Sequence, residues 1–470
     1  MDNISAMQKQ DSYPMLKKLD EWFQETAFLF NPAIQDIRQK ALKKFKEIGF
    51  PHQKMEKWQN TNLTDSLKYD YQLWTKEFSP AQIEKELFQC DVHDLNAFSI
   101  NLYRGRYVYK DVPIFEMGNG IIIGSLAAAI KEYPELIAKH FGHYISFENR
   151  AFDLLNTALF LDGLFVYVPK NIKMEQPIQL INAVGREENA FVQSRNLIIL
   201  EEGSELTFIH CDDSYDYKRS FTNSLSEFYI GENAKLDHYK LQNLNNSSSL
   251  INSDYFHQEA YSRLNTNKMI LNGGLIRNEV FNKLNGAGAE SNILGLYLVD
   301  QKQYVDNQVF VDHAVPNCQS NELFKGIVDD YAHAVFNGHI LVRPDAQKTL
   351  AFQNNNNIIL TDKAKVNTKP FLEIYADDVK CSHGATIGQL DESSLFYIRQ
   401  RGIGVENARL LLMYAFAAEV INEIKIESLQ IRIDDMVKKR LRGELSICDQ
   451  CVLHCSSPEY TFEIDMSKII

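Results

Sequence analysis

The N-terminal third of the chain carries apolar residues at helical spacing. Asn31 can cap a helix with Pro32 at its first position, and Gly49 can end that helix. Between these residues lies one apolar stripe, formed by Ile34, Ile37, Ala41, Phe45 and Ile48. This stripe predicts an amphipathic helix packed on a core. Similar spacing predicts helices near Met15–Thr26, Gln82–Phe88, Ser125–Phe141 and Phe147–Phe160, with short strands such as Arg106–Tyr109 between them.

From about Leu164 to Val379 the pattern changes to short β-rich runs separated by Gly, Asn and Asp. No long helical pattern lies between these runs, which excludes alternating βαβ units. Similar corners recur at 202–206, 232–236 and 362–366, each with a turn residue, a small residue and then an inward apolar residue. The recurrence predicts a solenoid in which each rung buries its face on the next. The predicted strands include Phe165–Val168, Ile178–Ile181, Leu197–Leu200, Leu206–Ile209, Ile293–Leu298, Gln308–Val311, His339–Val342, Ile358–Leu360 and Phe371–Ile374.

The amide-rich tract Gln353–Asn357 has two interpretations. Stacked amides at a rung corner can form hydrogen-bonded ladders, whereas the same composition also suits a solvated polar loop. The sequence does not decide between them.

After Asp391 the apolar spacing is helical again. Asp391 can cap a first helix that ends at Gly402. A second helix, from Glu406 to about Ile424, is apolar around much of its surface and must be buried on more than one side. A third begins near Ile426 and ends in a basic turn, the charge order that the helix dipole favours. We expect these three helices to dock on the solenoid or on another protein.

The chain is therefore predicted to be mainly β with helical ends. Its predicted segments are an N-terminal helical and mixed domain at 1–160, a parallel β-helix core at 161–390, a C-terminal helical domain at 391–445 and a cysteine-containing tail at 446–470.

Composition narrows the functional classes. The 470 residues carry a net charge of −13 and show no basic stripe, which argues against nucleic-acid binding. No apolar run approaches the length of a membrane span, and the first residues do not resemble an export signal, so we expect a cytoplasmic location. Seven cysteines without an export signal indicate free thiols or ligands rather than disulfides. Cys90, Cys211 and Cys318 are expected to be small core or surface residues.

The stretch Lys380–Leu390 (KCSHGATIGQL) brings a thiol and an imidazole together. In an extended segment, Cys381 and His383 project to the same face while Ser382 points away. Both are metal ligands, but two ligands do not complete a site, so a partner chain would have to supply the rest. From periodicity alone, a buried thiol with a hydrogen-bonded imidazole is the alternative.

A second group of ligands lies near the C-terminus. The spacing C-x2-C-x3-C can hold a metal ion or three corners of a cluster, with an imidazole as fourth donor. The residues are Cys448, Cys451, His454 and Cys455. A tail with incidental cysteines is the alternative.

Read together, three stretches resemble the SufB/SufD family of iron–sulfur cluster assembly proteins. They are 360–403 (LTDKAKVNTKPFLEIYADDVKCSHGATIGQLDESSLFYIRQRGI), the following ENARLLLMYAFAAEVINEI, and 49–63 (GFPHQKMEKWQNTNL). Cys-Ser-His-Gly at this position is similar to SufD rather than SufB. The resemblance implies a right-handed parallel β-helix, and it places Cys381 and His383 near an interface with a SufB-like paralogue, where iron or a transient iron–sulfur cluster is held.

The resemblance also implies a SufC-like ATPase bound to the C-terminal helices. The candidate contact residues are Leu395, Phe396, Ile398, Arg399, Arg401, Leu411 and Phe416. The chain has no G-x-x-x-x-G-K-[ST] loop, so any ATP hydrolysis is expected in that partner and the chain itself is expected to be a non-catalytic scaffold. No tightly bound cofactor is expected for the isolated chain. Flavin in the assembled complex and a homodimer of the isolated chain stay open.

Two other functions are consistent with a solenoid. A β-helical enzyme acting on polysaccharide would carry an export signal and clustered Asp, Arg and Lys on one face. A stand-alone metal-delivery protein would use the Cys448–Cys455 tail.

Overall fold

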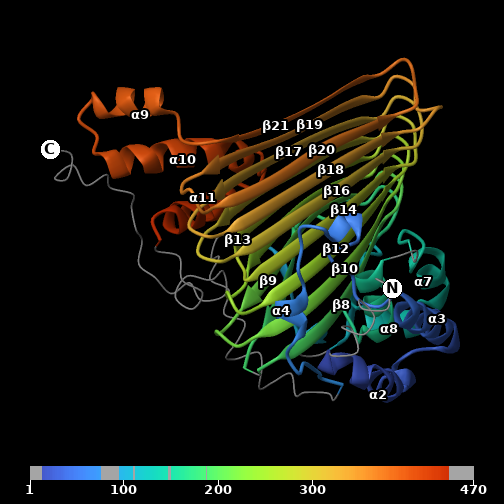
Figure 1. Ribbon diagram of the computed structural model, residues 1–470. Coiled ribbons are helices and arrows are strands. Elements are labelled where there is room, and N and C mark those ends of the chain that lie inside the picture. Colours follow the sequence, from blue (N-terminus) through green and yellow to red (C-terminus); the bar gives the residue numbers. More distant parts are fainter. Residues whose placement is uncertain (1–12, 76–94, 109–111, 147–149, 187, 444–470) are drawn as a thin grey trace.

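The computed structural model describes residues 13–75, 95–108, 112–146, 150–186 and 188–443. The chain forms a parallel β-solenoid of about seven turns between 165 and 388, with helices at both ends, which confirms the predicted fold class. Figure 1 shows the N-terminal helices (blue to teal) beside the early rungs and the C-terminal helices (orange to red) beside the later ones. None of the described helices combines the length and the apolar character needed to cross a membrane.

Successive strands alternate between two sheets, so each rung contributes one strand to each sheet. One sheet has the order β20-β18-β16-β14-β12-β10-β8-β6-β5-β4, with β1 pairing β8. Its strands are β1 (Gln72–Leu73), β4 (Ile114–Glu116), β5 (Ile122–Ser125), β6 (Leu164–Val168), β8 (Ala190–Leu200), β10 (Ser220–Ile230), β12 (Ser249–Gln258), β14 (Leu275–Leu284), β16 (Tyr304–His313), β18 (His333–Val342) and β20 (Lys365–Ile374).

The other sheet has the order β21-β19-β17-β15-β13-β11-β9-β7-β2-β3. Its strands are β2 (Phe98–Tyr103), β3 (Arg106–Val108), β7 (Ile178–Val184), β9 (Glu205–Ser214), β11 (Lys235–Asn243), β13 (Arg263–Asn272), β15 (Glu290–Val299), β17 (Gln319–Val328), β19 (Leu350–Ile359) and β21 (Lys380–Gly388). Strands from β6 onward pair in parallel, and the main apolar cluster lies between the two sheets.

The repeated corners have the predicted construction. At 202–206 the backbone turns at Gly203, whose φ of 67° favours glycine, and Ser204 beside it is buried. At 232–236 Asn233 makes the same turn with a φ of 58°, an angle that asparagine tolerates. Each corner then places an apolar residue in the core, Leu206 and Leu236 respectively. In both corners the turn residue is followed by a small buried residue, Ser204 or Ala234. The corners therefore share this local pattern although the spacing between them varies.

The N-terminal helices cover the outer face of the eleven-stranded sheet. In α3, the Asn31 side chain accepts a hydrogen bond from the Ile34 backbone amide, which confirms the predicted cap. The single helix predicted for Ser125–Phe141 is wrong in one respect, because Pro134 lacks an amide hydrogen and divides it into two. The predicted helix at 82–88 lies outside the described residues. The helices are η1 (Pro14–Lys18), α2 (Leu19–Glu25), η2 (Ala27–Leu29), α3 (Pro32–Ile48), η3 (Glu56–Trp58), α4 (Thr64–Leu67), α6 (Leu126–Glu132), α7 (Pro134–His140) and α8 (Ala151–Leu159).

The C-terminal helices dock on the outer face of the ten-stranded sheet, one of the two arrangements that the sequence predicts. They are α9 (Glu392–Arg399), α10 (Val405–Ile421) and α11 (Glu427–Leu441). The Asp391 side chain caps α9 by accepting a hydrogen bond of 2.7 Å from the Ser394 amide. Helix α10 packs on α9, on α11 and on β15 and β17, which explains its apolar residues on several sides.

Candidate functional site at the open end of the solenoid

The two ends of the solenoid differ. At the first rung, the short antiparallel strands β3, β4 and β5 continue the sheets, and helices pack beside them. At the last rung, β20 and β21 end the two sheets, and among the described residues no strand pairs with their outer edges. These edges present unpaired backbone groups together with exposed apolar side chains, which include Phe371, Ile374 and Ile387. Such an edge is a ready template for pairing with another chain.

Cys381 and His383 both lie on β21, at this open end. They pair in register with Ala351 and Gln353 of β19, whose side chains are buried inside the solenoid. Because alternate residues of a strand share a face, Cys381 and His383 both belong to the interior face of the last rung. Cys381 packs against the apolar core as a free thiol, and burial raises its pKa. His383 is exposed. The imidazole is therefore accessible to a partner rather than packed in the core.

Two polar residues lie directly behind His383 on the same interior row. Gln353 follows it on β19 and Glu322 follows on β17. The Gln353 Nε2 donates a hydrogen bond of 2.7 Å to Glu322 Oε2, and burial raises the pKa of the Glu322 carboxyl to about 7. A Cβ at Gly338 on the opposite wall would lie 1.9 Å from the Gln353 Nε2, so a larger residue there would force this amide to move. A carboxyl that exchanges protons near neutral pH thus lies close to the open end.

The amide tract also lines this interior. Gln353–Asn357 belongs to the middle of β19, so both sequence interpretations, a rung corner and a solvated loop, are wrong. Inward-facing Asn355 and Asn357 hydrogen bond to each other at 2.7 Å, and the Asn355 Nδ2 donates to the Tyr297 hydroxyl at 3.0 Å. The amides do form a network, but it runs along the inner face of the ten-stranded sheet rather than along a corner.

Deeper in the solenoid lies a charged layer that sequence reasoning missed. Lys240 pairs with Asp212 at 3.1 Å, Lys268 pairs with Asp254, and all four side chains are almost fully buried. Burial lowers the pKa of the neighbouring His238 well below its usual range. A signal was present, because these residues occupy alternate positions that continue the inward apolar pattern of their strands. Charged residues in such positions are usually assigned to the outside, which hid the layer.

The residues predicted to bind an ATPase divide into buried and exposed sets. Leu395 is buried, and Phe416 faces the solenoid with the Lys325 ammonium 4.4 Å from its ring centroid. Ile398 is half-buried. The exposed members are Phe396, Arg399, Arg401 and Leu411, and the Arg401 guanidinium lies 3.6 Å from the centroid of the exposed Tyr397 ring. Figure 1 shows α9 and α10 projecting beside the last rungs.

The metal-ligand predictions have separate outcomes. Cys448, Cys451, His454 and Cys455 lie outside the described residues, and their metal binding stays a prediction. Among the residues that are described, no three His, Cys, Asp or Glu side chains gather as a metal site. Cys211 and Cys318 are buried in the core, one of the two positions expected for them, while Cys90 falls outside the described ranges.

Comparisons with known proteins agree with this architecture. Residues 183–416 match the SufBD core domain of SUF system FeS cluster assembly, and residues 17–180 match the SufBD protein N-terminal region. The chain is 32% identical to an iron–sulfur cluster assembly SufBD family protein of Synechocystis, over 86% of this chain and 90% of that protein. It is 31% identical to the iron–sulfur cluster assembly protein SufD of Escherichia coli, over 86% of this chain and 92% of that protein. It is 25% identical to SufD of Bacillus subtilis, over 91% and 97%.

Proposed function

Because this chain belongs to the SufBD family of iron–sulfur cluster assembly proteins, we propose that it is a SufD-like, non-catalytic scaffold subunit. In this proposal the open end of the solenoid pairs with a SufB-like paralogue, and α9 with α10 carries a SufC-like ATPase. Iron or a nascent cluster is the cargo at the paired ends. Family membership favours this function over a polysaccharide-active enzyme.

The last rung of the solenoid combines unpaired strand edges with two candidate ligands, and this combination supports the proposal. The outer edges of β20 and β21 are unpaired in the described part of the chain, and β21 also carries Cys381 and His383. A partner strand added to these edges would gain backbone hydrogen bonds and would bring its own side chains beside the thiol and the imidazole. Two donors from this chain then need only one or two from the partner to hold iron.

The chemistry of the two donors supports a transient rather than a permanent site. Burial raises the pKa of Cys381, so its proton must leave before the sulfur can ligate iron. Glu322 lies inside the same end, and its carboxyl, with a pKa of about 7, can take up a proton at neutral pH. A site that must lose protons to bind iron releases it again when protons return, which suits assembly and transfer.

ATP hydrolysis is assigned to the partner in this proposal. The sequence lacks a phosphate-binding loop of the G-x-x-x-x-G-K-[ST] type. The exposed side chains of Phe396, Tyr397 and Leu411 offer the apolar surface on which an ATPase can dock.

Charged substitutions at the open end test the pairing. Ile374 and Ile387 are 38% and 48% exposed on the last rung, and the double variant Ile374→Lys, Ile387→Lys should abolish co-purification with a SufB-like partner while ATPase binding persists. The matched control is Phe352→Lys on β19, which is 40% exposed on the outer face. Size-exclusion chromatography with light scattering on co-expressed proteins measures both outcomes. Normal pairing by the double variant would remove the open end as the interface.

A further inference from the structure

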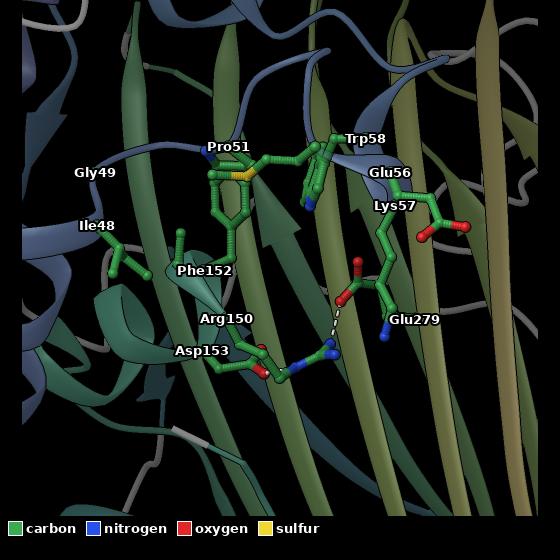
Figure 2. Close-up of a pocket in the computed structure, with 12 residues that line it drawn as sticks. Ile48, Gly49, Pro51, Glu56, Lys57, Trp58, Arg150, Phe152, Asp153 and Glu279 are labelled. Atoms are coloured by element: carbon green, nitrogen blue, oxygen red, sulfur yellow. Dashed lines mark hydrogen bonds and ion pairs between the residues drawn. The ribbon is translucent and has the colours of Figure 1, made fainter. Parts of the chain in front are cut away.

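Two adjoining hollows lie on the outer face of the eleven-stranded sheet, away from Cys381 and His383. The first, of about 330 Å³, lies under the arch formed by residues 49–58 (Figure 2). The second, of about 520 Å³, continues over β14, β16, β18 and β20. Both are lined by Glu56, Lys57, Arg150 and Glu279, so they form one continuous groove. Their sizes fall in the range of small-molecule sites.

Carboxylates of the protein hold both guanidinium groups of the groove. Arg150 pairs with Asp153 at 2.5 Å and with Glu279, as Figure 2 shows. Arg277 pairs with Glu279 at 2.6 Å and with Asp306. Both guanidinium groups therefore have their counterions within the protein.

Lys57 differs, because only the more distant charges of Glu279 and Glu56 act on it. In the described part of the chain no hydrogen bond or ion pair holds its ammonium. Burial lowers its pKa, and the nearby Arg150 and Arg277 add to this effect, while the carboxylates of Glu279 and Glu56 oppose it. An anion placed beside Lys57 would offset the repulsion from the two guanidinium groups and would accept a hydrogen bond from the ammonium.

Flat apolar surfaces lie on both sides of this ammonium. In the first hollow, Trp58 and Phe152 (Figure 2) have ring centroids 5.5 Å apart, and Met55 and Pro51 also line this hollow. In the second hollow, Phe310 and Phe371 lie on either side of His339, with ring centroids 5.0 and 4.8 Å from its imidazole. Such surfaces stack well against planar rings.

We propose that this groove binds a small organic anion with a planar apolar part, whose charge pairs with Lys57 and whose ring lies on the adjoining aromatic side chains. The groove uses η3, the residues at the start of α8 and the outer face of the sheet, and it meets the proposed partner interface only at β20, where Phe371 lines the second hollow.

The test uses the full chain and three probes: 1-naphthyl phosphate, inorganic phosphate and 1-naphthol. Isothermal titration calorimetry should show 1-naphthyl phosphate binding at least about tenfold more tightly than either of the other two. Lys57→Met should lower the affinity for 1-naphthyl phosphate by about tenfold. Phe310→Ala should weaken the binding of 1-naphthyl phosphate but not that of inorganic phosphate. This variant supplies a second test of the groove if Lys57→Met lowers the stability of the protein.

The matched control is Lys54→Met, which removes the same charge from the same arch but does not line the groove. It should leave the affinity unchanged. Equal affinities in Lys57→Met and Lys54→Met would overturn the proposal, as would a wild-type chain that binds 1-naphthyl phosphate no better than inorganic phosphate.

Discussion

Cys381 and His383 lie two residues apart on one face of a strand, yet their surroundings differ. The thiol packs against the core and its pKa is raised by burial, whereas the imidazole is exposed at the open end. The imidazole can therefore meet an incoming ligand first, and the thiol ligates only after losing its proton. This order makes His383 the more sensitive position for replacement.

Glu322 allows a test of the polar interior behind these two residues. Burial raises its pKa from 4.5 to about 7. Between these two pH values the folded chain keeps a proton on Glu322, whereas the unfolded chain has lost it. Stability from this group is therefore complete below pH 4.5 and is lost as the pH rises through 7. The isosteric variant Glu322→Gln cannot ionise, and it should gain about 1 to 3 kcal/mol over wild type at pH 8.

Thermal unfolding of both proteins at pH 5 and pH 8 measures this effect. The melting temperature of Glu322→Gln should exceed that of wild type at pH 8, with a smaller difference at pH 5. An equal difference at both values would mean that the carboxyl does not titrate in this range.

At the scale of elements, α10 attaches the C-terminal helices to the solenoid and also belongs to the surface proposed to bind the ATPase. Its buried residues Ala417, Val420 and Ile421 attach the C-terminal helices to the ten-stranded sheet. Removing everything after Gln389 would expose the apolar surface beneath, so truncation would confuse lost binding with aggregation. Point variants on exposed side chains separate the two tasks.

Phe396→Asp is the sharper variant for the ATPase surface. Phe396 is 64% exposed, so the substitution should leave the melting temperature nearly unchanged and should weaken binding of a SufC-like ATPase by at least about tenfold. Phe28, which is 77% exposed on η2 near the other end of the chain, provides the control Phe28→Asp. Surface plasmon resonance with the purified ATPase gives both affinities. Equal binding by the two variants would place the ATPase elsewhere.

Element prediction succeeded where short-range signals decide the conformation. The Asn31 and Asp391 caps and the turn at Gly203 depend on neighbouring residues, so local sequence determined them. The same reasoning failed at Pro134, where a helical apolar pattern concealed a break. It also failed at Gln353–Asn357, because polarity suggested a surface position while the strand register placed alternate amides in the core.

For the whole molecule, the solenoid with helical ends was predictable from the changes in apolar period along the chain. The candidate site was predictable only as a pair of ligands, Cys381 and His383, and the resemblance to a known family supplied their expected role. Their position on the last rung, with Gln353 and Glu322 behind them, required the register of three strands. The charged layer around Lys240 and Lys268 left a signal in the alternation of its strands, but which charges pair across rungs depends on contacts between distant residues, and these leave no local pattern.

In the part of the molecule that the structure describes, one end of the solenoid is covered and the other is open, and the proposed function places the partner at the open end. Short strands and helices continue the first rung, as terminal repeats of solenoids commonly require. The last rung has no such cover among the described residues, and it carries the two candidate ligands. A partner that covers this end would complete both the sheets and the ligand set.

Cluster maturation by complexes that carry His383→Ala tests this account most directly. Complexes of the variant or the wild type with SufB-like and SufC-like partners would be matched for folded content, and transfer of a cluster to an apo-protein would be followed by its absorbance. We expect the variant to fold, to assemble with both partners and to lose most of its cluster formation, with Cys381→Ser showing a smaller loss. Normal maturation by the His383→Ala complex would contradict the account and would leave the open end a purely structural interface.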